Sequence, residues 1–112
     1  MYNYLKRKGY SNKYEHAGIY CIKIDDAIVY IGKSYNMLKR VAEHYALIRT
    51  NSAETKYKIL AHASRKGHKI NFDVLYDAKA RNYYAIQEEI GAKEGEFLRQ
   101  YNPVLNSQIP SA

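Results

Sequence analysis

The feature that most constrains this chain is a pair of short segments separated by two aspartates. Residues 18–24 and 27–31 are rich in β-branched and aromatic side chains, which favour strands. Asp25-Asp26 between them is a turn signal. Neighbouring strands joined by so short a connection must be antiparallel, because parallel strands need a long crossover. The sequence therefore predicts a β-hairpin around which the rest of the domain is built.

Hydrophobic periodicity after the hairpin predicts two helices, a third strand and a third helix. The expected elements are a helix capped by Ser34 or Asn36 and ending near Arg49, a helix from about Glu54 to Arg65, a strand over residues 69–76, and a helix from about Asn82 to Tyr101. We expect Gly32 to end the second strand, and Gly67 and Pro103 to stop helices. The order β-β-α-α-β-α predicts one α/β (α+β) domain, a small three-stranded antiparallel sheet flanked by helices.

Charge indicates the kind of partner. Eighteen Lys and Arg residues oppose eleven Asp and Glu residues, giving a net charge of +7 and a pI near 9.4. A polyanion such as nucleic acid is the natural partner for this charge, although solubility alone also explains it. Cys21 is the single cysteine, which excludes a disulfide framework and a cysteine zinc cluster. Without an apolar run of about 20 residues or a signal peptide, we expect a soluble, cytoplasmic protein and no membrane partner.

Residues 1–16 form a basic, tyrosine-rich arm ahead of the main domain, which we place at residues 17–112. Interleaved aromatic and basic side chains suit a single strand or a groove of nucleic acid, although a frayed terminus has the same composition. A second basic set on the second predicted helix could follow phosphates: Lys56, Lys58, Arg65, Lys66 and Lys69.

A carboxylate interrupts the apolar stripe of the last helix. Glu94 lies among the members of this stripe, Ile86, Ile90, Phe97 and Tyr101. A carboxylate that faces inward must be paired, protonated or bound to a cation. On the residues alone, Glu94 is either half of a salt bridge or a cation ligand.

The first predicted helix carries a polar row. Asn36, Arg40 and His44 are four residues apart, so they share one helix face. An arginine and a histidine one turn apart suit a phosphate, because the guanidinium can bind two oxygens at once. A solvated polar face gives the same pattern, and both interpretations stay open.

Several short motifs stand at matching distances. Gly18-Ile19-Tyr20 and Tyr30-Ile31-Gly32 lie ten residues apart from tyrosine to tyrosine, and Lys33-Ser34 follows. Arg40 comes eight residues after Gly32, and His44 four residues later. Glu94 precedes Pro103 by nine residues, ahead of the closing segment Tyr101-Asn102-Pro103-Val104-Leu105-Asn106. Over about residues 17–106 the chain resembles the GIY-YIG nuclease superfamily, which includes the nuclease domain of the excision-repair UvrC protein and some homing and restriction endonucleases.

The resemblance implies a catalytic centre of five residues: Tyr20, Tyr30, Arg40, His44 and Glu94. It implies hydrolysis of a phosphodiester with one Mg²⁺ (or Mn²⁺) ion, on which Glu94 is the only protein carboxylate. Such a site suits Mg²⁺ because this ion keeps most of its waters. The resemblance places Lys33, Arg40 and Asn106 at the phosphate, and Asn106 is also expected to orient the loop or the glutamate.

The general base stays open between Tyr20 and Tyr30. A free phenol has a pKa near ~10, so a neighbouring cation must favour the phenolate or a partner must accept its proton. Lys33 and His44 are the residues expected to do so. The sequence does not decide between the two tyrosines.

The resemblance predicts a divalent-metal-dependent endonuclease, with DNA favoured as the substrate. A nucleic-acid-binding module of the same fold that does not cleave is an alternative, and a protein-interaction domain of a larger assembly is another. The choice between DNA and RNA, the specificity, the pathway and the oligomeric state are left open by the sequence.

A shared site requires Tyr20 and Tyr30 to lie on one face of the hairpin. The simplest arrangement places them directly opposite each other, which needs an odd loop, Ile24-Asp25-Asp26. A two-residue Asp25-Asp26 turn would place Tyr20 opposite Ile31 and Tyr30 opposite Cys21, so the tyrosines would lie on opposite faces. Asp-Asp is also a poor two-residue turn, because both positions of a type I′ turn need positive φ. We therefore expect the three-residue loop.

Overall fold

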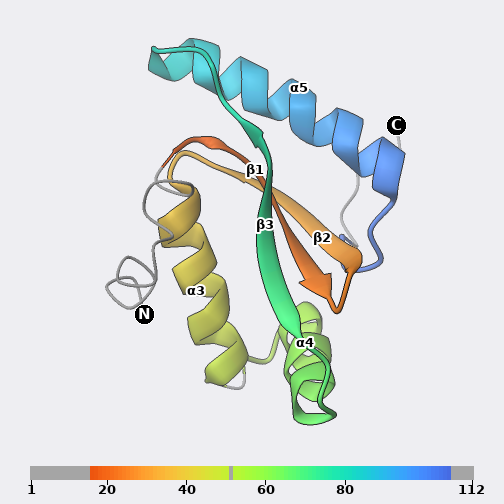
Figure 1. Ribbon diagram of the computed structural model, residues 1–112. Coiled ribbons are helices and arrows are strands. Elements are labelled where there is room, and N and C mark those ends of the chain that lie inside the picture. Colours follow the sequence, from red (N-terminus) through yellow and green to blue (C-terminus); the bar gives the residue numbers. More distant parts are fainter. Residues whose placement is uncertain (1–15, 51, 107–112) are drawn as a thin grey trace.

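The computed structural model describes residues 16–50 and 52–106, and in them three strands and three helices follow in the predicted order (Figure 1). Their bounds are β1 Gly18–Ile24, β2 Ala27–Ser34, α3 Met37–Arg49, α4 Thr55–Arg65, β3 Ile70–Asp77 and α5 Tyr83–Tyr101. The predicted N-terminal arm lies outside the described residues, apart from His16. No helix in the described part of the chain has both the length and the apolar character to cross a membrane.

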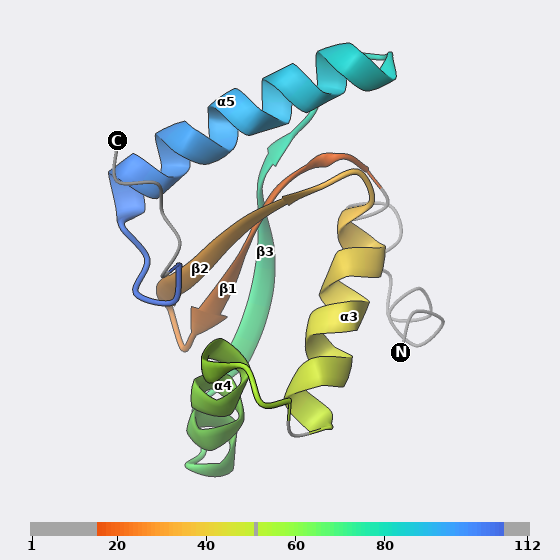
Figure 2. The same cartoon turned by 180° about the vertical axis from the view of Figure 1, so that it is seen from behind.

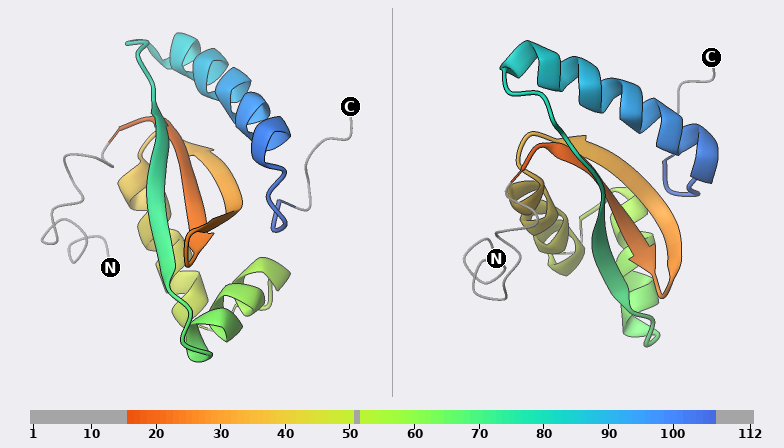
Figure 3. Two further views of the ribbon diagram at one scale, coloured as in Figure 1. Left: turned by 45° about the vertical axis from the view of Figure 1, so that its right-hand side comes forward. Right: turned by 45° about the horizontal axis from the view of Figure 1, so that its top comes forward.

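The sheet is antiparallel throughout, in the order β2-β1-β3, so β1 is central and β2 forms one edge. Helices α3 and α4 cover one face of the sheet and α5 crosses the other (Figures 2 and 3). Successive residues of a strand point to opposite faces, so β1 contributes to two cores. Tyr20 and Ile22 pack towards α3 and α4, while Ile19 and Cys21 pack towards α5.

The hairpin register corrects one expectation and satisfies another. The turn is the two-residue Asp25-Asp26, with Ile24 opposite Ala27, so the predicted three-residue loop is wrong. A β-bulge then shifts the register between Ile22 and Lys23 and leaves Val29 as an extra residue in β2. Beyond the bulge Tyr30 lies opposite Ile22, and Tyr20 lies opposite Gly32. The two tyrosines are therefore diagonal neighbours on one face, as a shared site requires.

The Asp-Asp turn forms because the segment just before β3, His68 and Lys69, holds its first residue. Asp25 adopts a positive φ of 54°, which aspartate tolerates better than most residues. Its backbone N–H donates to the Lys69 carbonyl at 2.7 Å, and its carboxylate accepts from the Lys69 N–H at 3.0 Å and contacts His68 Nδ1 at 2.8 Å. These contacts from a distant segment compensate for the conformation that argued against a short turn.

Both motif glycines are required by close packing. A Cβ on Gly18 would lie 2.1 Å from the Tyr76 carbonyl oxygen, and one on Gly32 would lie 2.4 Å from the Tyr20 hydroxyl. The expectation that Gly32 ends β2 is wrong, since the strand continues to Ser34. Gly32 is instead the position where the Tyr20 ring passes over β2. The central isoleucines, Ile19 and Ile31, are fully buried against α5.

The predicted helix ends are confirmed. The side chain of Asn36 accepts from the Lys39 N–H and caps α3, and Asn82 accepts from the Ala85 N–H and caps α5. Ser34 contributes to the first of these ends, because its hydroxyl donates to the Asn36 carbonyl. Gly67 follows α4 with a φ of 93°, which favours glycine.

Tyr76 and Tyr101 do not lie on the faces that regular strand and helix spacing indicates. A second bulge leaves Leu75 as an extra residue in β3, so Tyr76 turns from the face of Phe72 to the α5 side. Near the end of α5 the buried position is Leu98, whereas Tyr101 is exposed. Regular alternation along the predicted strand over residues 69–76 would have kept Tyr76 on the face of Phe72. The inward position of Tyr101 in the apolar stripe was wrongly predicted.

The segment after α5 covers the open edge of β2. Leu105 donates its N–H to the carbonyl of the bulge residue Val29 at 2.8 Å. The Asn106 side chain pairs with both backbone groups of Ile31, accepting from its N–H at 2.8 Å and donating to its carbonyl at 2.8 Å. Asn106 thus replaces the missing neighbouring strand, which protects an otherwise unpaired edge.

Candidate active site

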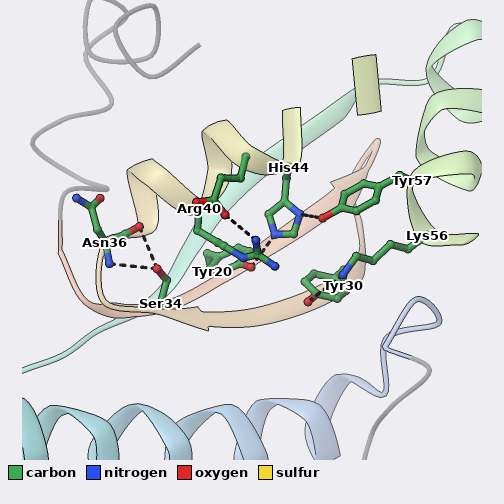
Figure 4. A network of polar contacts seen from close by, with 9 residues as sticks. Tyr20, Tyr30, Ser34, Asn36, Arg40, His44, Lys56 and Tyr57 are labelled. Carbon is green, nitrogen blue, oxygen red and sulfur yellow. Dashed lines mark hydrogen bonds and ion pairs between the residues drawn. The ribbon is translucent and has the colours of Figure 1, made fainter. Parts of the chain in front are cut away.

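A buried histidine links two tyrosines beneath the α3 side of the sheet (Figure 4). His44 is 0% exposed, with Nε2 2.7 Å from the Tyr20 hydroxyl and Nδ1 2.7 Å from the Tyr57 hydroxyl. The three residues come from α3, β1 and α4, so the chain of contacts forms only when these elements dock. His44 faces inward because it follows Val41 at a spacing of three on the helix side that packs on the sheet.

The pKa values of Tyr20, His44 and Tyr57 keep these three side chains neutral. Burial lowers the pKa of His44 to about 3, and the charges of Arg40 and Lys56 act in the same direction. Burial and the neighbouring Tyr30 raise the pKa of Tyr20 well above its usual value, and burial raises the pKa of Tyr57 to about 12. His44 is therefore not the phosphate-binding cation that the polar row suggested.

The charge of Arg40 acts on Tyr20 in the opposite direction to burial and partly offsets the rise in the pKa of Tyr20. A neutral imidazole donates from one ring nitrogen and accepts at the other. His44 therefore accepts a hydrogen bond from one tyrosine hydroxyl and donates one to the other.

The accessible groups of this cluster are Arg40 and Tyr30. Arg40 is half-buried and forms an ion pair with Glu43 at 2.7 Å, one turn further along α3. Tyr30 is also half-buried, and its ring centroid lies 6.4 Å from that of Tyr20 and 5.6 Å from that of His44. Lys56 Nζ lies 4.6 Å from the centre of the Tyr30 ring and 3.5 Å from its hydroxyl. Tyr30 is therefore a phenol with a cation beside it and access to solvent.

A second polar group lies across the sheet, where α5 packs on β2. Lys33 points to the α5 side, with Nζ 3.9 Å from a Glu94 carboxylate oxygen. The Glu94 side chain is 25% exposed, and burial raises its pKa while the charge of Lys33 partly opposes the shift. A contact of 3.9 Å is too long for a hydrogen bond. Glu94 is therefore a half-exposed carboxylate without a tight partner in this contact.

The predicted site residues thus form two groups. Tyr20, Tyr30, Arg40 and His44 meet on the face that α3 and α4 cover, whereas Lys33 and Glu94 meet on the α5 face. Edge strand β2 lies between the two groups and contributes Tyr30 to the first and Lys33 to the second. The sequence suggested Lys33 as the cation beside the tyrosines, but Lys33 lies on the other face of the sheet. Asn106 binds the backbone of Ile31 between them.

Sequence reasoning missed two members of the first group. The sequence indicates Lys56 only as part of a basic set, although Lys56 lies over the Tyr30 ring. Tyr57, Leu60 and Ala61 have the spacing of an inward helix face, and Tyr57 is 1% exposed, but this spacing does not indicate its contact with His44. Nothing local indicated that the same turn of helix reaches His44 and Tyr30.

Comparison with known proteins decides the family. No family model matches the sequence. Endonuclease II of enterobacteria phage T4 is 31% identical over 114 residues, which cover 93% of this chain and 80% of that protein. A mutant of bacteriophage T4 EndoII superposes with a TM-score of 0.55 at 27% identity, over 81% of this chain and 74% of that one.

The GIY-YIG N-terminal endonuclease domain of UvrC from Thermotoga maritima, bound to magnesium as its catalytic divalent cation, shares the fold. Its TM-score is 0.53 at 19% identity, over 89% of this chain and 93% of that domain. The chain belongs to the GIY-YIG nuclease superfamily.

A GIY-YIG nuclease implies a divalent cation, and the residues at Glu94 fit one kind of ion. In residues 16–50 and 52–106 no three or more His, Cys, Asp or Glu side chains gather as a metal cage. A single half-exposed carboxylate suits Mg²⁺, which retains several waters and binds through one or two carboxylates and substrate phosphates. The raised pKa of Glu94 agrees, because a cation would relieve the cost of ionising it.

Proposed function

We propose that this protein is a metal-dependent endonuclease that hydrolyses DNA phosphodiester bonds at the β2 edge of its sheet. The observation that carries the proposal is the position of two complementary groups on either side of β2. One side offers Arg40 and the tyrosine–histidine chain, and the other offers Glu94 with Lys33. The endonuclease relatives and the net charge of +7 support a nucleic-acid substrate. A nucleic-acid substrate also supports a cytoplasmic location.

Glu94 is the residue proposed to hold one Mg²⁺ or Mn²⁺ ion. When bound, the ion supplies Lewis-acid polarisation of the phosphate and neutralises the leaving oxygen. Lys33, 3.9 Å from the same carboxylate, adds a second positive charge at the place where phosphate oxygens would lie. Asn106 holds the Ile31 backbone between the two groups and retains one amide hydrogen for the substrate.

Arg40 is proposed to bind the non-bridging phosphate oxygens as negative charge builds on them. Its guanidinium already pairs with Glu43 at 2.7 Å, so it is held in place before substrate arrives. Phosphate would share the guanidinium with Glu43, since five donors are available on one fork. Arg40 would therefore be oriented at little entropic cost.

Tyr30 is the phenol that can contact the attacking water, because Tyr20 is only 1% exposed. Lys56 donates from Nζ to the Tyr30 hydroxyl at 3.5 Å and would orient this hydroxyl towards the attacking water. Tyr20 and His44 provide a second place for a proton. Arg40 and Lys56 both lower the pKa of His44 by their charge. A bound phosphate would neutralise these charges and make His44 a better proton acceptor.

The test is cleavage of supercoiled plasmid, of duplex, branched and single-stranded DNA, and of RNA, in Mg²⁺, in Mn²⁺ and in EDTA. We expect metal-dependent nicking of DNA that Glu94→Gln and Arg40→Ala each abolish while the circular dichroism spectrum stays unchanged. Matched controls are Glu96→Gln on α5 and Arg49→Ala on α3, which should cleave normally.

Three outcomes would contradict parts of this proposal. Normal turnover by folded Glu94→Gln would refute the metal assignment. Salt-sensitive binding of DNA without cleavage in either metal would identify the alternative, a module that binds nucleic acid without cutting it. Affinity that does not change between low and physiological salt would remove nucleic acid as the partner.

A further inference from the structure

Three exposed tyrosines meet at the start of α5, outside the site described above. Tyr35, Tyr83 and Tyr84 are 38%, 57% and 80% exposed. The rings of Tyr35 and Tyr83 are stacked, with centroids 4.9 Å apart and planes within 2° of parallel. Tyr84 stands edge-on to Tyr83, at 5.5 Å and 89°. We call these three residues the tyrosine platform.

Two rings of the platform, Tyr35 and Tyr83, are held by polar contacts as well as by stacking, and Tyr84 packs edge-on against Tyr83. The Tyr35 hydroxyl donates to the Tyr83 carbonyl at 3.1 Å, and Gln87 donates to the Tyr83 hydroxyl at 2.8 Å. The Asn82 cap fixes the first turn of α5 beneath it. A ring fixed before binding loses little conformational freedom when a ligand stacks on it.

Structural clamping does not account for the whole platform. Tyr35 and Tyr83 together tie α5 to the link between β2 and α3, and this contact needs no third ring. Tyr84 is 80% exposed and extends the exposed rings of Tyr35 and Tyr83 into one aromatic patch, and contiguous exposed apolar surface marks interaction sites.

The platform is continuous with the proposed catalytic edge. Tyr35 directly follows Ser34, the last residue of β2, and Lys33 of the same strand lies beside Glu94. Tyr83 precedes Glu94 by eleven residues of the same helix, which corresponds to about 16 Å at ~1.5 Å per residue. This distance spans about five nucleotides at ~3.4 Å of rise each. Arg81, exposed just before α5, adds positive charge for a phosphate.

Resting on the proposed nuclease function, we propose that the tyrosine platform stacks against an unpaired base of the substrate about five nucleotides from the cleaved bond. Every base has a π-face that an aromatic ring can bind, and such stacking is tolerant of sequence. A paired base within a duplex keeps both of its faces covered by its neighbours. The platform therefore favours substrates with a bulge, a mismatch or a single-stranded segment at that distance.

The test compares binding of two sets of DNA by Glu94→Gln protein, which the proposed function makes inactive but folded. One set is fully paired, and the other carries a single unpaired 2-aminopurine at stepped distances from the mapped cut site of the wild-type enzyme. Stacking of this base on tyrosine changes its fluorescence. Tyr84→Ala removes an exposed ring, Tyr84→Phe keeps the ring, and Tyr101→Ala removes another exposed tyrosine of the same helix.

We expect Tyr84→Ala to weaken binding of the unpaired set at least about 5-fold and to change the paired set less than about 2-fold. Tyr84→Phe and Tyr101→Ala should match the parent protein, and the fluorescence change should be largest near five nucleotides. Equal effects of Tyr84→Ala on both sets, or no effect on either, would overturn the proposal. A change in oligomeric state in place of DNA binding would also overturn it and assign the platform to a second copy of the chain.

Failure of the two proposals gives different results. If the wild-type protein cleaves paired DNA and Tyr84 has no influence on either set, the nuclease stands and the platform fails. If no substrate is cleaved in any metal, the unpaired base is stepped along the DNA without reference to a cut site. A Tyr84-dependent preference for unpaired DNA would then leave the platform standing while the nuclease fails.

Discussion

The buried imidazole of His44 makes the stability of this domain depend on pH with a calculable sign. Burial lowers the pKa of His44 to about 3 in the folded protein, whereas an unfolded histidine titrates near ~6.5. Between these values the unfolded chain binds a proton that the folded chain does not. The free energy of unfolding therefore rises with pH across this window, by up to about 1.4 kcal/mol per pH unit. This contribution is fully present above ~6.5 and is lost as the pH falls towards the folded pKa.

The expected magnitude is large for a domain of this size. From about pH 7.5 to about pH 4.5 the single proton on His44 removes about 2.5 kcal/mol, out of the 5–15 kcal/mol that is typical of small domains. Carboxylates titrate at the lower end of this range and also contribute. The pKa values of Asp25 and Glu89 are lowered and act in the same direction, and the raised pKa of Glu94 acts in the opposite direction.

The assay is urea unfolding, followed by far-ultraviolet circular dichroism, at several pH values. His44→Gln is the reference, because glutamine can hydrogen-bond to both tyrosines and does not titrate. Its overall stability is expected to be lower, but only the difference in pH dependence matters, and in that difference the carboxylates cancel. We expect the wild-type protein to lose about 2.5 kcal/mol more than His44→Gln between these pH values. If the free energy of unfolding changed with pH equally in the wild-type protein and in His44→Gln, a neutral, buried His44 would be refuted.

Three further substitutions test other contacts. Gly32→Ala places a Cβ 2.4 Å from the Tyr20 hydroxyl, so the free energy of unfolding in urea should fall by about 1–3 kcal/mol. Nicking activity should fall by more than this loss of stability explains. An unchanged free energy of unfolding and unchanged nicking would contradict the close packing of Tyr20 on Gly32. Asn106→Ala leaves both backbone groups of Ile31 unpaired and should cost about 1–3 kcal/mol in urea unfolding. Asn71→Ala, at an exposed position of β3, is the control with the same change of side chain. Lys56→Met keeps the aliphatic stem over Tyr30 but removes the ammonium that donates to its hydroxyl, so nicking should fall while the circular dichroism spectrum stays unchanged. Unchanged nicking would show that Tyr30 does not depend on this contact.

Local chemistry made most of the fold predictable from the sequence. Strand and helix periodicity, the asparagine caps at Asn36 and Asn82, and Gly67 after α4 each depend on residues within a few positions. The tripeptides 18–20 and 30–32 were recognisable because packing or chemistry restricts the residue type at each position. Glycine admits a close approach, isoleucine fills the α5 core, and tyrosine faces α3.

The sequence could not predict what depends on docking between distant elements. One extra residue at Val29 decides which face Tyr30 takes, and a bulge has no compositional signal of its own. Lys56 reaches Tyr30 only because α4 packs beside α3 and the sheet. The Asp25-Asp26 turn was misjudged for the same reason, because its stabilising contacts come from Lys69, more than forty residues away.

The closing contact of Asn106 with Ile31 has a consequence for how the chain folds during synthesis. It joins residues 75 positions apart, so a growing chain can make it only after α3, α4, β3 and α5 have been synthesised. Until Asn106 leaves the ribosome, β2 presents free N–H and carbonyl groups to any other extended chain. Contacts of long sequence separation also form slowly, because the entropy of closing the loop must be overcome first. A nascent or truncated chain that lacks Asn106 should therefore be more prone to edge-to-edge aggregation than the full chain. Its dependence on chaperones should fall once Asn106 can pair with Ile31.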